Sequence, residues 1–132
     1  MIGIVIVAHG GLAREYLAAV EHVVGAQPGV VAVSIEADHD RRRKQAEICT
    51  AADEVDTGDG VVVVTDLFGG SPSNLSLLAC QPENRRIVYG MNLPMLIKLA
   101  KSRQMDVPGA VKGALEAGRK YIDSVNVRPD PH

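Results

Sequence analysis

The chain has 132 residues, of which 46% are hydrophobic and 23% are charged, and its formal net charge at pH 7 is −2. These values are typical of one compact globular domain, so we treat residues 1–132 as a single domain. The chain has one Phe, three Tyr and no Trp. The aromatic platforms and positive charge of nucleic-acid-binding modules are therefore missing, and we expect no nucleic-acid partner.

Strands and helices are predicted to alternate along the chain. β-branched runs predict strands at Ile2–Ala8, Val30–Glu36, Gly60–Asp66 and Arg86–Gly90. Apolar residues at helical spacing, with Asp, Ser and Pro at helix starts, predict helices at Leu12–Gly25, Asp40–Val55, Ser71–Cys80 and Pro94–Ala100. A last helix begins at Pro108, with Val111, Leu115 and Ile122 facing inward. The tail, Asp123–His132, could add one short edge strand at Ser124–Val127.

This alternation predicts an α/β fold, a doubly wound and mainly parallel four-stranded sheet of order 2-1-3-4 with helices on both faces. In such sheets ligands bind beyond the carboxyl ends of the strands, where the strand order reverses. The first and third strands are neighbours at that point. His9 and Asp66, which follow them, are therefore expected to face each other.

The residues at this edge suit phosphoryl transfer onto histidine. A carboxylate that accepts a hydrogen bond from one imidazole nitrogen fixes the tautomer and leaves the other lone pair free. Gly69 and Gly70 let the backbone approach a ligand, and Ser71 begins a helix whose free amides attract an anion. From the residues alone, His9 could instead be a structural histidine and Asp66 a loop cap, and Ser71 caps its helix on either interpretation.

Other polar residues carry weaker signals. His22 is expected to face solvent. His39 lies between two loop acids and is interpreted as a polar residue at the start of a helix rather than as a metal ligand. The basic run Arg41–Lys44 is unusual at a helix start and is interpreted as a solvated face. The segment GGSPS is not a nucleophile elbow, and no phosphate-binding GxxxxGK[ST] loop or clean GxGxxG motif occurs. We therefore expect no nucleotide cofactor and no metal.

The N-terminal residues read as a strand rather than as a targeting segment. No basic segment precedes the first apolar run, and no stretch of 18 apolar residues occurs. Cys49 and Cys80 lack metal-ligand spacing and are expected to be small buried hydrophobic side chains. A cytoplasmic protein is expected.

Over nearly its whole length the chain resembles the mannose-type EIIA domain of the bacterial phosphoenolpyruvate:sugar phosphotransferase system. The similar segments are IGIVIVAHG, VVVVTDLFGGSPSN, YGMNLPML and EAGRKYI. The resemblance implies that His9 is the phosphorylated histidine and Asp66 its supporting aspartate. It also matches the family's turn to Gly69, Gly70, Ser71 and Asn74, and its NxP segment to Asn92 and Pro94.

The same resemblance implies partners. Phosphorylated HPr would donate to Nε2 of His9, and His9 would pass the group to an EIIB protein for sugar uptake or to a regulatory chain. Contact with a membrane would be indirect, through a permease. Relatives form homodimers that exchange a C-terminal strand, and here the candidate is the tail near Val125–Val127. Some relatives continue into a fused EIIB domain.

Three other classes of protein share part of this pattern. A tetrapyrrole metal chelatase also begins with a strand that ends in His-Gly, but it should place a further histidine in the pocket, and His39 and His132 are poor candidates. A receiver-like signalling module would be phosphorylated on Asp66, but it needs extra acids after the first strand, and residues 5–12 contain none. Histidine phosphatases need Arg where Ala8 stands.

Overall fold

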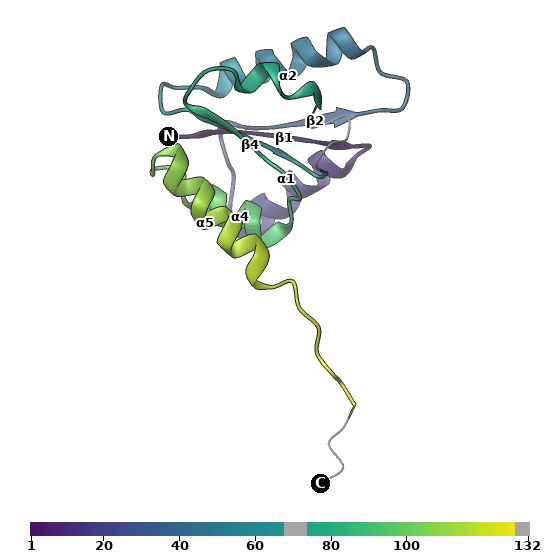
Figure 1. Ribbon diagram of the computed structural model, residues 1–132, viewed down its shortest axis with the longest axis vertical. Helices are drawn as coiled ribbons and strands as arrows, with labels where there is room; N and C mark the ends of the chain where they lie inside the picture. The colour runs from purple at the N-terminus through teal and green to yellow at the C-terminus, as the bar shows by residue number, and fades with distance from the viewer. Residues whose placement is uncertain (68–73, 129–132) are drawn as a thin grey trace.

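A computed structural model describes residues 1–67 and 74–128 of the chain. These residues form a four-stranded parallel sheet in the order β2-β1-β3-β4, as predicted (Figure 1). The strands are β1 (Gly3–His9), β2 (Val30–Ile35), β3 (Val61–Thr65) and β4 (Arg85–Val88). The α-helices are α1 (Leu12–Val24), α2 (Arg41–Val55), α4 (Leu93–Lys101) and α5 (Val107–Lys120), and Leu78–Cys80 form a short 3-10 helix.

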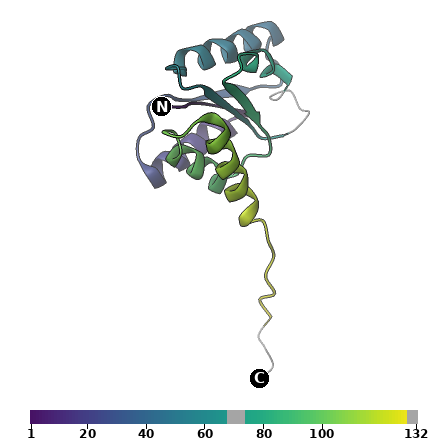
Figure 2. The same ribbon diagram turned by 60° about the vertical axis from the view of Figure 1, so that its left-hand side comes forward.

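Helices cover both faces of the sheet, and β1 and β3 are therefore buried on both sides (Figures 1 and 2). Successive side chains of a strand point to opposite faces. Ile4 and Ile6 therefore pack with α1, α4 and α5, whereas Val5 and Val7 pack with α2. The two apolar layers hold the carboxyl ends of β1 and β3 at one edge of the domain.

Polar caps fix where three helices begin. Asp40 Oδ1 accepts hydrogen bonds from the amides of Arg42 and Arg43 at 3.0 and 3.2 Å, which offsets part of the cost of basic residues at this end of α2. Asn92 caps α4 by accepting from the Met95 amide at 3.0 Å, and its Nδ2 donates to the Gly118 carbonyl of α5 at 2.8 Å. The NxP segment therefore has a structural role here. Asp106 caps α5 in the same way.

The C-terminal region differs from the prediction in two respects. Helix α5 ends at Lys120, and Ile122 is exposed rather than inward-facing because the chain leaves the domain after the cap residue Tyr121. Residues 122–128 extend away from the body of the domain, and Ser124–Val127 form no edge strand in the described part of the chain (Figure 2). Of the predicted helix Ser71–Cys80, residues 71–73 lie outside the described ranges. The described remainder has a helical turn at 74–75 and then the 3-10 helix.

Gly60 provides a test of how tightly β3 is anchored. It precedes β3 with a φ of +95°, and a Cβ atom there would overlap the Asn84 carbonyl oxygen and Val107. We expect Gly60→Ala to lower the free energy of unfolding by about 2–4 kcal/mol, because left-handed strain and overpacking add. Gly58, with a φ of +104° and open space around it, is the matched control. Gly58→Ala should cost only about 1–2 kcal/mol in urea unfolding, and equal losses would contradict the account.

Candidate active site

The two candidate catalytic residues lie side by side at the carboxyl edge of the sheet. In the register of the β1–β3 pair, Val7 lies beside Thr65. His9 is the last residue of β1, and Asp66 directly follows β3. The predicted meeting of these residues at the point where the strand order reverses is therefore observed.

His9 and Asp66 are joined by two hydrogen bonds to the same carboxylate oxygen. Nδ1 of His9 lies 2.9 Å from Oδ2 of Asp66, and the backbone amide of His9 donates to Oδ2 at 3.1 Å. An ionised carboxylate can only accept, so Nδ1 carries a proton. The His9 side chain is 50% exposed and the Asp66 side chain 12% exposed. The pair therefore presents a half-exposed ring whose proton is held on Nδ1, which leaves the lone pair on Nε2.

The electrostatics of Asp66 favour its ionised form. Burial raises the pKa of the Asp66 carboxyl, but the hydrogen bonds from the His9 ring and amide, together with positive charge on that ring, outweigh burial and hold the pKa below its usual value. The second oxygen, Oδ1, is buried and has no hydrogen-bond partner among the described residues. A carboxylate that stays negative beside the ring can stabilise positive charge that forms there.

The start of α1 adds backbone amides that the sequence analysis did not single out. Gly10 has a φ of +56°, and Gly11 is the N-cap residue of α1, so no side chain caps this helix. A Cβ atom at either glycine would meet nothing within 4 Å. The first amides of a helix lack intrahelical partners and attract anions. The His-Gly-Gly sequence before an apolar helical pattern was the signal that could have predicted them.

The predicted phosphoryl-binding turn is described only in part. Gly69, Gly70 and Ser71 lie outside the described residues. Asn74 is exposed in the helical turn at 74–75, and its carbonyl accepts a hydrogen bond from the Leu77 amide at 3.4 Å. A phosphoryl-binding role for these four residues stays a prediction.

A second histidine, His39, lines the same surface depression as His9, although it was considered a poor candidate for a further histidine in the pocket. His9, Gly10 and His39 line one surface depression of about 360 Å³, together with Ile35, Glu36 and Ala37. Nδ1 of His39 is hydrogen-bonded to the Glu36 carbonyl oxygen. The loop after β2 reaches this edge because β2 pairs with β1 and Ile35 lies beside His9. The predicted strand order could have indicated this neighbour.

The remaining polar candidates lie elsewhere. His22 is exposed on α1, and Arg41–Arg43 are exposed at the start of α2. Cys49 and Cys80 are free and half-buried, and burial raises the pKa of the Cys80 thiol to about 11.

Within residues 1–67 and 74–128, no cluster of three or more His, Cys, Asp or Glu side chains could hold a metal ion. In those ranges no helix is both long and apolar enough to cross a bilayer.

The fold and this edge define a class, the doubly wound α/β domains that present a carboxylate-held histidine at the strand-order reversal. Comparison with known proteins gives the family. The model of the EIIA-man family, described as the PTS system fructose IIA component, matches residues 3–115. The chain belongs to this mannose-type EIIA family of the sugar phosphotransferase system (PTS).

Named relatives agree with this assignment. The chain is 28% identical over 131 residues to the mannose-specific EIIAB component of Escherichia coli, an alignment that covers 97% of the chain and 41% of that relative. It is 26% identical to the sorbose-specific EIIA component of Lacticaseibacillus casei, covering 93% of the chain and 90% of the relative. The structure of a mannose/sorbose-specific IIA subunit from Enterococcus faecalis superposes with a TM-score of 0.85 at 26% identity, covering 97% of both chains. The chain thus spans about two fifths of the EIIAB relative.

Proposed function

We propose that this chain is a phosphocarrier, which accepts a phosphoryl group on Nε2 of His9 and passes it on. The observation that carries the proposal is the 2.9 Å contact between Nδ1 of His9 and Oδ2 of Asp66, in a ring that is half exposed. Membership of the mannose-type EIIA family supports phospho-HPr as the donor. The names of the E. coli relatives support an EIIB partner as the acceptor.

The transfer step uses the free lone pair of His9. Nε2 attacks the phosphorus atom of the donor's phosphoimidazole, a P–Nε2 bond forms, and the donor's P–N bond breaks and returns its electron pair to the donor ring. The His9 ring becomes positive because Nδ1 keeps its proton, and Asp66 faces that proton. Phosphoryl transfer depends mainly on position and on charge stabilisation, and this pair offers both. Transfer to the acceptor is the reverse reaction at a new imidazole or thiolate.

The phosphoryl oxygens need donors as well. We propose that the backbone and side chains at Gly69, Gly70, Ser71 and Asn74 supply them, as the family resemblance implies. The uncapped amides at the start of α1 lie two residues beyond His9 and are a second source. Backbone amides and the side chains of Ser71 and Asn74 are neutral hydrogen-bond donors.

Reconstitution tests the proposed function. Purified chain is mixed with labelled phosphoenolpyruvate, enzyme I and HPr, and the label on the chain is followed after treatment with acid or base. We expect a label that is lost in acid and stable in base, the behaviour of phosphohistidine. A label that is lost in base and kept in acid would point instead to an aspartyl phosphate. Onward transfer to an EIIB protein, and from it to sugar, separates an uptake role from a regulatory one.

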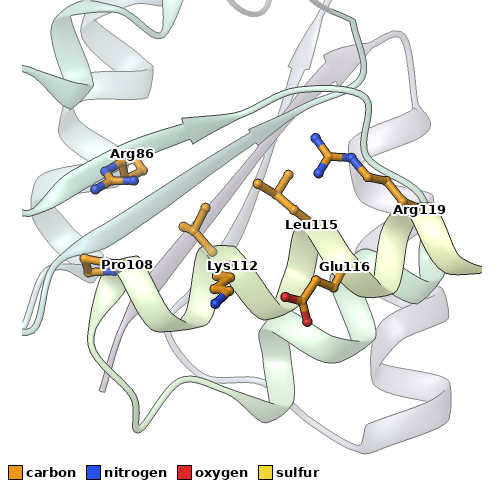
Figure 3. Close-up of a pocket in the computed structure, with 7 residues that line it drawn as sticks. Arg86, Pro108, Lys112, Leu115, Glu116 and Arg119 are labelled. Atoms are coloured by element: carbon orange, nitrogen blue, oxygen red, sulfur yellow. The ribbon is translucent and has the colours of Figure 1, made fainter.

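We also propose that two copies of the chain form a dimer by exchanging their tails. Within the described residues β4 pairs with β3 on one side only, so its other edge has unpaired backbone groups. A groove of about 350 Å³ runs beside that edge between Arg86 of β4 and the α5 residues Leu115 and Arg119 (Figure 3). The tail that could fill it carries exposed Val125 and Val127, which a strand would place on one face.

Paired charge substitutions test the exchange. We expect the double variant Val125→Asp, Val127→Asp to become a monomer at micromolar concentration in sedimentation equilibrium, because its apolar face could no longer be buried. The double variant Ser124→Asp, Asn126→Asp adds the same charge on the opposite face and should remain a dimer. A wild-type chain that is monomeric throughout, or equal behaviour of the two variants, would contradict tail exchange.

A further inference from the structure

A second imidazole shares the surface depression of His9. His39 is half-buried in the loop between β2 and α2 and lines the same depression as His9, Gly10 and Glu36. Because both histidines line one depression of about 360 Å³, a group bound to His9 that projects into the depression shares it with His39. The phosphocarrier role proposed above assigns no task to His39.

The hydrogen bond of His39 determines what its ring can donate. Nδ1 is bonded to the Glu36 carbonyl oxygen, which can only accept, so Nδ1 carries the proton. In the neutral ring, Nε2 then carries a lone pair, which repels an anion. In the protonated ring Nε2 becomes an N–H donor and the ring carries a positive charge. Histidine side chains exchange between these forms in roughly the pH range 5–8.

Charged side chains from the loop of His39 and from α2 line the surface beside it. On its own loop the ionisable neighbours are Glu36, Asp38 and Asp40, and on α2 they are Arg43, Lys44 and Glu47. The ionisable group from β1 is His9 itself. Asp40 accepts hydrogen bonds from the α2 amides, and Lys44 forms an ion pair with Glu47 at 2.8 Å. The other charged neighbours of His39 are the acidic residues Glu36 and Asp38 and the basic residue Arg43. A phosphoryl group on His9 would add negative charge to this depression and favour the His39 imidazolium.

We propose that His39 is a second phosphoryl-binding residue, whose imidazolium donates its Nε2–H to an oxygen of the phosphoryl group on His9. This proposal rests on the proposed function in one respect, that His9 carries the phosphoryl group. The contact stabilises the doubly charged form of the phosphoryl group. The phosphorylated protein therefore binds a proton at His39 in the same pH range in which the phosphoryl group loses its last proton. Occupancy of His9 thereby becomes dependent on pH near neutrality.

The test uses chemical phosphorylation, so that no partner protein is needed. Phosphoramidate transfers its phosphoryl group to an imidazole nitrogen as its P–N bond breaks and ammonia leaves. The site of modification is mapped by mass spectrometry, and the 31P resonance of phospho-His9 is then followed from pH 5 to pH 9. Wild type is compared with His39→Asn, whose side-chain amide can still donate to the Glu36 carbonyl but has no group in place of Nε2. His22→Asn, on the exposed face of α1, is the control histidine variant.

We expect the 31P titration midpoint to lie about one pH unit lower in wild type and in His22→Asn than in His39→Asn, because a nearby positive charge favours the phosphoryl dianion. A purely structural role for His39 predicts equal midpoints, since the asparagine variant keeps the loop hydrogen bond. Equal midpoints, or phosphorylation of His39 itself in place of His9, would overturn the proposal. If phosphoramidate modifies His9 with the expected midpoints but phospho-HPr does not, the phosphocarrier role fails and the His39 contact stands.

Discussion

Replacing His9 with alanine is expected to abolish phosphoryl labelling of the chain from phosphoenolpyruvate, enzyme I and HPr. The substitution removes the nucleophilic nitrogen, and no other group takes its place beside Asp66 among the described residues. His9 is exposed and lies outside both apolar clusters, so the variant should keep its fold. Labelling is measured by autoradiography, and circular dichroism checks the fold.

His22→Ala is the matched control for this experiment. It removes an exposed histidine from α1 and should label like the wild type. Undiminished label on His9→Ala would mean that another residue accepts the phosphoryl group, and the mechanism proposed for His9 would have to be abandoned. Loss of label in both variants would indicate a general effect of the substitutions on donor binding.

Substitutions of Asp66 should separate the orientation of the ring from the stabilisation of its charge. The Oδ2 position accepts from both the ring and the amide of His9, so the amide oxygen of Asp66→Asn can occupy it and keep the tautomer. Only the negative charge is lost, and the difference between a charged and a neutral acceptor is about 1–2 kcal/mol. We therefore expect labelling of Asp66→Asn to be about tenfold slower.

Asp66→Ala removes both hydrogen bonds and leaves the His9 ring free to rotate and to change tautomer. We expect labelling about a hundredfold slower than in wild type, a loss of roughly 3 kcal/mol of transition-state stabilisation. The control is Asp59→Asn, an exposed carboxylate in the loop before β3, at the strand's opposite end. Single-turnover rates of labelling are measured for all three variants. Rates of Asp66→Ala within twofold of wild type would show that the carboxylate is not needed.

The pairing of His9 with Asp66 could be predicted because it follows from topology. Buried β-branched runs separated by helical patterns allow few sheet arrangements, and right-handed crossovers then bring the ends of β1 and β3 together. A loop residue within one position of a strand end has little freedom to lie elsewhere. The two-sided burial of β1 and β3 was likewise evident from their unbroken apolar sequence.

The position of His39 was harder to predict because it depends on a loop. Its ring is placed by the Glu36 carbonyl and by the Asp40 cap that begins α2, and the path between them cannot be deduced from hydrophobic periodicity. Ile122 was misplaced for a related reason. The helical spacing of apolar residues continues past Lys120, but the chain leaves the domain there and the side chain is exposed.

The protonation of the His9 ring tests the central claim most directly. In protein labelled with 15N at histidine, long-range proton–nitrogen correlation spectra distinguish a protonated ring nitrogen from one with a free lone pair. At a pH where the ring is neutral, we predict that Nδ1 carries the proton and Nε2 is unprotonated, and that Asp66→Ala mixes the two tautomers. A wild-type ring protonated mainly at Nε2 would contradict the account, because the nitrogen that must attack phosphorus would have no lone pair to offer.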